Sequence, residues 1–160
     1  MMTLFKPLEQ KIKSVTSIAD DFLPLRATYP LVTTNGCFDL LHIGHLQNLL
    51  TGAGLSPYLV VLLNSDVSVK QLKGSNRPIQ TEHDRALILA SLSVVWRVAI
   101  FNEPTPVRAL EILKPNIHVK GAEYEHQEIP EKHLIPKWGG KLVFAPELPN
   151  KRTSLLINQL

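Results

Sequence analysis

Short apolar runs rich in valine, isoleucine, leucine and phenylalanine recur along the chain. Within each run the apolar residues are nearly continuous and do not alternate strictly with polar ones. This pattern is typical of parallel strands that are covered on both faces of a sheet. It predicts five strands, at residues 31–34, 58–64, 94–101, 116–120 and 141–145.

Segments with a helical spacing of apolar residues lie before, between and after these runs. Thr81 is a suitable N-cap for one of them, and Pro104 and Pro106 fit the first turn of another. A weak amphipathic pattern opens the chain, within a lead-in that spans residues 1–30. The predicted helices cover residues 7–20, 42–52, 81–92, 104–113 and 153–160.

The alternation of strands and helices predicts an α/β fold, a Rossmann-like, open, parallel five-stranded sheet with helices on both faces. The length suits a single domain that covers residues 1–160. Ligands of such sheets bind beyond the carboxyl ends of the strands. Polar and small residues follow most of the predicted strands, so we expect a binding site along that edge.

Charge and composition exclude several classes of protein. Seventeen basic and 14 acidic residues give a formal net charge of +3, which is too small to indicate a nucleic-acid-binding surface. The longest purely apolar run, Tyr58–Leu63, is far shorter than the ~20 residues of a membrane-spanning helix. The single cysteine, Cys37, excludes an internal disulfide framework and a multi-cysteine zinc site. The first residues lack the layout of a signal peptide, so we expect a cytoplasmic protein without nucleic-acid or membrane partners.

The most informative stretch runs from Asn35 to His45, where the first predicted strand leads into a helix. Gly36 allows a tight turn and a close approach of the backbone to a ligand. His42 and His45 lie three residues apart, so both rings share one face of the first helical turn, and Gly44 leaves space between them. Two imidazoles beside a helix N-terminus form a cradle for phosphoryl oxygens. The positive end of the helix dipole disfavours their protonation, so neutral N–H donors are expected.

Other interpretations of this stretch are less specific. The two histidines are also compatible with surface or capping positions on a core helix. A zinc site would need Cys37 to contribute alone beside the histidines, because no further Cys or His pair has a suitable spacing. A lone cysteine beside two histidines also suggests a nucleophilic thiol. We favour the phosphate cradle.

The stretch Thr34–Asp39, followed by His42-Ile43-Gly44-His45, resembles the cytidylyltransferase-like nucleotidyltransferases. Within this family the chain is most similar to the bacterial D-glycero-β-D-manno-heptose 1-phosphate adenylyltransferases. The resemblance covers residues 31–160. Further stretches support it in order along the chain: Asn64-Ser65-Asp66, Leu72-Lys73-Gly74, Arg77-Pro78-Ile79, Asp84-Arg85-Ala86, Pro104-Thr105-Pro106, Val119-Lys120-Gly121 and Trp138-Gly139-Gly140.

The resemblance implies nucleotidyl transfer, in which a sugar 1-phosphate attacks the α-phosphate of ATP and pyrophosphate leaves. It implies that His42 and His45 hydrogen-bond the phosphates as charge builds, and that Lys73 neutralises phosphate charge. Mg²⁺ is expected on the triphosphate, with no protein residue named as a metal ligand. For contact with the nucleotide it implies Asn35, Gly36, Cys37, Phe38, Gly44, Lys120, Gly121, Thr153 and Ser154. For contact with the phosphate acceptor it implies Asp39, Arg77 and Arg85.

Two other functions stay open at this stage. One is a CTP-dependent glycerol-3-phosphate or other alcohol-phosphate cytidylyltransferase. The other is a non-catalytic nucleotide-binding protein on the same fold, because Arg152 replaces a serine usual in the family and Ala122 a glycine. Homodimers are common in the family, and apolar residues within 81–100 are a candidate interface.

Overall fold

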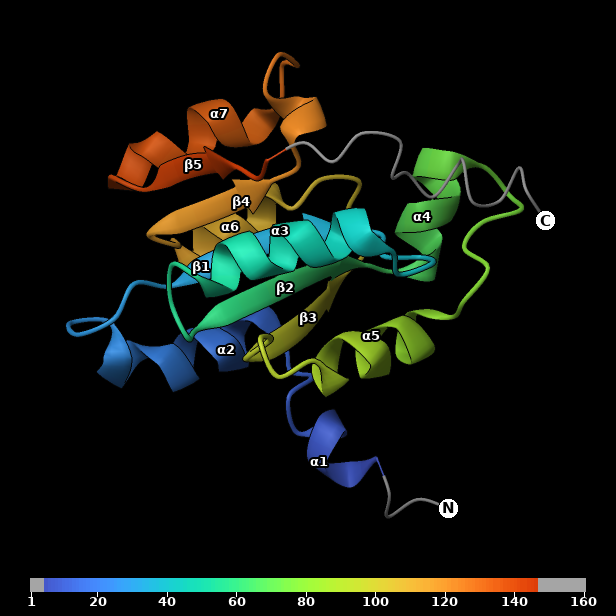
Figure 1. The fold of residues 1–160 in the computed structure, drawn as a ribbon, viewed down its shortest axis with the longest axis horizontal. Helices are drawn as coiled ribbons and strands as arrows, with labels where there is room; N and C mark the ends of the chain where they lie inside the picture. Colours follow the sequence, from blue (N-terminus) through green and yellow to red (C-terminus); the bar gives the residue numbers. More distant parts are fainter. Residues whose placement is uncertain (1–4, 147–160) are drawn as a thin grey trace.

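The computed structural model describes residues 5–146 of the chain. Five strands form one parallel sheet in the order β3-β2-β1-β4-β5 (Figure 1). All five predicted strands are confirmed, with small shifts at their ends, and the Rossmann-like α/β class is confirmed with them. Their bounds are Val32–Gly36 for β1, Leu59–Asn64 for β2, Arg97–Phe101 for β3, Ile117–Lys120 for β4 and Lys141–Phe144 for β5.

The helices agree with the sequence prediction in part. Three predicted helices, at 42–52, 81–92 and 104–113, are present with shifted ends. The prediction of one helix at 7–20 was wrong, because this segment contains two helices. The helix predicted at 153–160 lies outside the described residues. The observed α-helices are α1 (Lys6–Glu9), α2 (Val15–Phe22), α3 (Ile43–Ala53), α4 (Asp66–Lys73), α5 (Glu82–Ser91), α6 (Val107–Leu113) and α7 (Pro130–Leu134).

The lead-in breaks at residues 11–13 because the backbone there pairs with the edge strand β3. Lys13 N donates to Val98 O, and Val98 N donates to Lys11 O, both at 2.9 Å. Ser14 then starts α2 as its N-cap, accepting a hydrogen bond from Ser17 N. The pairing covers the open edge of β3, which would otherwise expose unpaired backbone groups.

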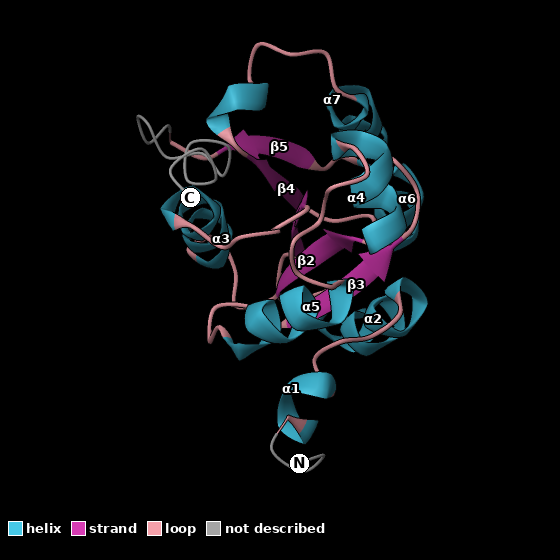
Figure 2. Cartoon of the chain, turned by 90° about the vertical axis from the view of Figure 1, so that its right-hand side faces the viewer, coloured by secondary structure: helices cyan, strands magenta, loops and turns pink. Residues whose placement is uncertain are grey.

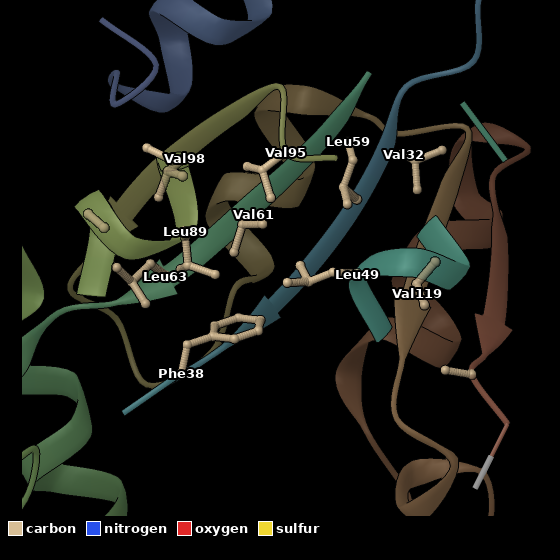
Figure 3. Packing of buried hydrophobic residues seen from close by; sticks show 13 residues of the cluster. Val32, Phe38, Leu49, Leu59, Val61, Leu63, Leu89, Val95, Val98 and Val119 are labelled. Carbon is tan, nitrogen blue, oxygen red and sulfur yellow. The ribbon is translucent and has the colours of Figure 1, made fainter. Parts of the chain in front are cut away.

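Apolar side chains of alternate strand residues enter two cores, one on each face of the sheet. Leu59, Val61 and Leu63 of β2 pack with α3 and α5 on one face, where Figure 3 shows them around Leu49 and Leu89. Val60 and Leu62 pack with α2, α6 and α7 on the other. Figure 2 shows α3 and α6 on opposite sides of the sheet. Burial on both faces explains why the strands are continuously apolar.

The strand order places a switch point between β1 and β4. From β1 the chain first builds β2 and β3 on one side, and later adds β4 and β5 on the other. The loops that follow β1 and β4 therefore leave the carboxyl ends of these two strands in opposite directions. Open parallel sheets bind ligands at such a point. None of the helices within residues 5–146 combines the length and apolar character needed to cross a membrane.

Candidate active site

The turn from β1 into α3 is shaped by Gly36 and Phe38. A Cβ on Gly36 would lie 3.0 Å from the Phe38 ring, so glycine permits the ring to fold back onto the strand end. Phe38 has a positive φ of 45°, a left-handed conformation that is rare for a bulky residue. Its ring is buried in the core beside Leu49 (Figure 3). This core packing holds the unusual backbone of the turn in place.

His42 and His45 stack against each other at the start of α3. Their ring centroids lie 3.8 Å apart at an interplanar angle of 26°. The Phe38 ring packs against His45 on a tilted geometry, with centroids 4.9 Å apart. His42 is the N-cap of α3, and its Nδ1 accepts a hydrogen bond of 3.1 Å from Gly44 N. Because Nδ1 accepts, the proton of a neutral His42 ring is on Nε2, which remains a donor for a ligand.

Both rings are held in the neutral form. Burial, followed by the nearby His42 and Lys73, lowers the pKa of His45 to about 3, although the Leu40 carbonyl acts in the opposite direction. Burial and Lys73 also lower the pKa of His42, against a smaller opposing effect of Glu123. The buried Nδ1 of His45 has no hydrogen-bond partner of good geometry within residues 5–146. The pair therefore offers uncharged ring nitrogens beside a helix N-terminus.

Lys73 lies on a helix that the sequence analysis missed. It is the last residue of α4, and Gly74, whose φ is +95°, follows it as the C-cap. The side chain is exposed. After burial, its positive charge also acts to lower the pKa of His42 and His45.

Asp39 is buried and holds the segment that carries Arg77. Its Oδ1 accepts hydrogen bonds from the backbone N–H groups of Ile79 and Gln80, at 2.7 and 3.1 Å. Its Oδ2 lies 3.0 Å from Arg77 Nη2. The other amino group, Arg77 Nη1, is buried without a hydrogen-bond partner in the described chain. Asp39 thus holds Arg77 in place, and Arg77 keeps one donor that could serve an anionic ligand.

Arg85 has a different environment from the one expected for an acceptor-binding side chain. It is fully buried, and its Nη1 donates to Cys37 O and Asn64 O at 2.6 and 2.8 Å. Its Nη2 bonds Asp66 Oδ1 at 2.7 Å. These contacts join the ends of β1 and β2 to the starts of α4 and α5. Arg85 thus holds the turn in place, and its expected contact with the acceptor phosphate stays a prediction.

Lys120 ends β4, and Gly121 follows it. The Lys120 ammonium is buried between Asn35 Oδ1 and Glu131 Oε1, each 3.0 Å away. Glu131 lies on α7, a five-residue helix that the sequence analysis missed and for which Pro130 at its first position was the one local signal. Burial raises the pKa of the Cys37 thiol, so a nucleophilic thiolate is disfavoured.

Nitrogen donors dominate this edge of the sheet. Imidazole, guanidinium and ammonium groups suit phosphate oxygens and do not suit Mg²⁺, which prefers oxygen ligands. Within residues 5–146, no group of three His, Cys, Asp or Glu side chains is placed to hold a metal. Thr153 and Ser154, predicted to contact the nucleotide, lie outside the described residues.

Comparison with known proteins identifies relatives of the chain. Residues 33–147 match the family model described as cytidylyltransferase-like. The bifunctional protein HldE of Paramagnetospirillum magneticum is 46% identical over 127 residues, which are 79% of this chain and 26% of that protein. The bifunctional protein HldE of Helicobacter pylori is 54% identical over 99 residues, 62% of this chain and 21% of that protein. The chain thus spans about a quarter of the length of these curated relatives.

A solved structure shares the fold. The lipopolysaccharide core biosynthesis protein from Thermoplasma volcanium GSS1 superposes with a TM-score of 0.62 at 28% sequence identity. The superposition covers 74% of this chain and 98% of that one.

Proposed function

The chain belongs to the cytidylyltransferase-like family of nucleotidyltransferases, and we propose that it joins ATP to a sugar 1-phosphate, giving an ADP-sugar and pyrophosphate. The observation that carries this proposal is the stacked, neutral pair His42 and His45 at the N-terminus of α3. A helix N-terminus with imidazole donors binds phosphate oxygens. The type of reaction is inferred from the family, and the hydrogen-bond donors are inferred from the geometry of the two rings.

The proposed reaction is a single in-line displacement. A phosphate oxygen of the sugar 1-phosphate attacks the α-phosphorus of ATP, and the bond to the bridging oxygen of the β-phosphate breaks as pyrophosphate leaves. The Nε2–H of His42 and a ring nitrogen of His45 donate to phosphate oxygens that gain charge in the transition state. Neutral donors are suitable, since they stabilise charge without giving up a proton. Mg²⁺ bound to the triphosphate would neutralise part of its charge.

Lys73 and Arg77 extend the cradle in this proposal. The exposed Lys73 ammonium and the unpartnered Arg77 Nη1 lie on segments next to the turn. Both groups attract phosphate, Lys73 as a point charge and Arg77 as a directional donor. We assign Lys73 to the triphosphate and Arg77 to the acceptor phosphate.

The proposed acceptor is heptose 1-phosphate, for a pathway that builds lipopolysaccharide. Support comes from the resemblance of Val119-Lys120-Gly121 and Trp138-Gly139-Gly140 to heptose enzymes, and from the similarity to HldE proteins. The solved relative is itself named as a lipopolysaccharide core biosynthesis protein. A CTP-dependent transfer to an alcohol phosphate is the alternative that the name of the family model suggests.

A pyrophosphate-release assay tests the proposal. The protein is incubated with ATP or CTP against heptose 1-phosphate, other sugar 1-phosphates and glycerol 3-phosphate, each with Mg²⁺. We expect turnover with ATP and heptose 1-phosphate. Turnover confined to CTP and an alcohol phosphate would replace the proposed substrates. Nucleotide binding without any turnover would identify a non-catalytic protein.

A further inference from the structure

A buried chain of polar side chains crosses from β1 to α7 at the switch point. Thr33 Oγ1 lies 2.7 Å from His118 Nδ1, and His118 Nε2 lies 3.3 Å from Asn35 Oδ1. The same Oδ1 accepts from Lys120 Nζ, which also donates to Glu131 Oε1. Thr33, His118, Lys120 and Glu131 are buried, whereas Asn35 is half-buried at the strand end.

The ammonium group of Lys120 determines which way the Asn35 amide faces. An ammonium group only donates, so the amide atom 3.0 Å from it must be the oxygen. His118 then donates from Nε2 to the same oxygen and accepts from the Thr33 hydroxyl at Nδ1. Burial lowers the pKa of His118 well below its usual value, in keeping with a neutral ring that has one N–H donor. Both hydrogen bonds of the Asn35 side chain therefore use Oδ1.

Most contacts of the Lys120 ammonium are made within the protein. One donor is used on Asn35, a second on Glu131, and the ammonium lies 4.3 Å from the centroid of the Tyr124 ring. Its side chain is only 7% exposed. Asn35 differs in this respect, because no acceptor in the described residues takes a hydrogen bond from its Nδ2. The two Nδ2–H groups are the part of this network that remains available at the strand edge.

We infer that Lys120 and Glu131 are positioning residues for nucleotide binding: they hold the Asn35 amide so that it presents Nδ2–H donors to the nucleotide. The inference rests on the proposed function, since it deepens the same site. A donor-only group selects a hydrogen-bond acceptor, either a phosphate oxygen or an acceptor atom of the nucleoside. Glu131 acts from α7, through Lys120, without touching the ligand.

A double variant separates positioning from stability. Removing one partner alone would leave a buried charge unpaired, which destabilises a fold strongly. The pair Lys120→Met with Glu131→Leu removes both charges at similar volume, a replacement that is often neutral for stability. We expect an unchanged Tm together with an affinity for ATP, measured by calorimetry, that falls about tenfold as the amide loses its fixed orientation. Unchanged affinity in the folded double variant would overturn the inference.

Asn35→Asp provides a second variant with its own outcome. The carboxylate keeps the acceptor for Lys120 and His118 but removes the Nδ2 donors. We expect affinity to fall about 10- to 100-fold, the range for losing a hydrogen bond to a charged group. An equal loss for ATP, CTP and inorganic triphosphate places the acceptor on the phosphates, and a loss for the nucleotides alone places it on the nucleoside. Wild-type affinity for all three probes would contradict the inference.

A control and a ligand-free measurement distinguish this inference from the proposed function. Lys11→Met removes another partly buried ammonium, which donates to Ala90 O and Leu92 O away from the site. It is expected to lower Tm and leave affinity unchanged. The NMR order parameter of the Asn35 side-chain amide needs no nucleotide, and it should fall in the double variant. An unchanged order parameter overturns the positioning role, whereas a wild-type protein without turnover contradicts only the proposed reaction.

Discussion

The arrangement and the neutral state of His42 and His45 have one cause that is local in the sequence and one that depends on the tertiary fold. The spacing of His42 and His45 on one helical turn is a sequence property, so the pairing of their rings could be predicted. Their neutral state was predicted from the helix dipole, but the largest cause in the folded protein is burial. Burial depends on Phe38, whose ring covers one side of His45. The sequence contained no sign that Phe38 takes a positive φ.

Replacement of His45 tests its part in catalysis. We expect His45→Ala to fold and to lose ~10²–10³-fold in turnover, the usual effect of removing one donor to a developing oxyanion. The measurement is the steady-state rate of pyrophosphate release, with circular dichroism to verify folding. His83→Ala is the matched control, since this exposed histidine lies on α5 and contacts none of the site groups described above. Near-full activity in folded His45→Ala would remove the ring from the mechanism.

The lowered pKa of His45 also predicts how stability changes with pH. In the unfolded chain this ring takes up a proton near pH 6.5, whereas in the folded protein it does so only near pH 3. The unfolded state therefore binds more protons between these values, and the free energy of unfolding falls as the pH is lowered through this window. The slope is up to about 1.4 kcal/mol per pH unit for one group.

Urea denaturation at pH 7, 6 and 5 measures this dependence. We expect wild-type stability to fall toward pH 5 more steeply than that of His45→Ala, which lacks the titrating ring. His42 and His118 have lowered pKa values as well and contribute in the same direction in both proteins. Equal slopes for the two proteins would show that His45 is protonated normally in the folded state.

At the scale of elements, α4 shows where sequence patterns were insufficient. The segment 66–73 is short and mostly polar, and Gly74 directly after it is a residue typical of loops. Ser65 was nevertheless an N-cap signal, and it accepts a hydrogen bond from Ser68 N. Asn64 and Asp66 follow a predicted strand, where polar residues were expected to form part of a binding site. Instead Asn64 Nδ2 donates to Ser68 Oγ and Asp66 pairs with Arg85, so both hold elements together.

Arg85 is the residue that connects the ends of β1 and β2 with the starts of α4 and α5. Its guanidinium bonds four oxygens, on Gln80, on Cys37 of the β1–α3 turn, on Asn64 at the end of β2 and on Asp66 of α4. We expect Arg85→Met to lower the free energy of unfolding by about 3–5 kcal/mol, because it leaves buried acceptors without donors. Chemical denaturation measures the change. Arg108→Met is the control, since Arg108 is 79% exposed and its ion pair with Glu103 is expected to contribute little. Similar stabilities for the two variants would contradict this role.

At the scale of the whole molecule, topology was the most predictable feature. Alternating apolar runs and helices determine a parallel sheet with right-handed crossovers, and the switch point follows from the strand order. Side-chain burial at the site was not predictable, because it depends on how α4, α5 and α7 pack onto the strand ends. For that reason the near-complete burial of Asp39 and Arg85 was not expected.

The exposure of apolar side chains bears on the expected homodimer interface. No large apolar side chain within 81–100 is highly exposed, so the candidate interface proposed there has no support in the structure. Exposed large apolar residues include Ile43 and Leu50 on α3, Val67 and Leu72 on α4, and Ile79. A homodimer stays a prediction.

A crystal structure of the protein with a non-hydrolysable ATP analogue, bridged by a methylene between the α- and β-phosphates, tests the central claim most directly. We predict α-phosphate oxygens within about 2.7–3.1 Å of His42 Nε2 and a ring nitrogen of His45, at the N-terminus of α3. A triphosphate bound away from both rings would contradict the account.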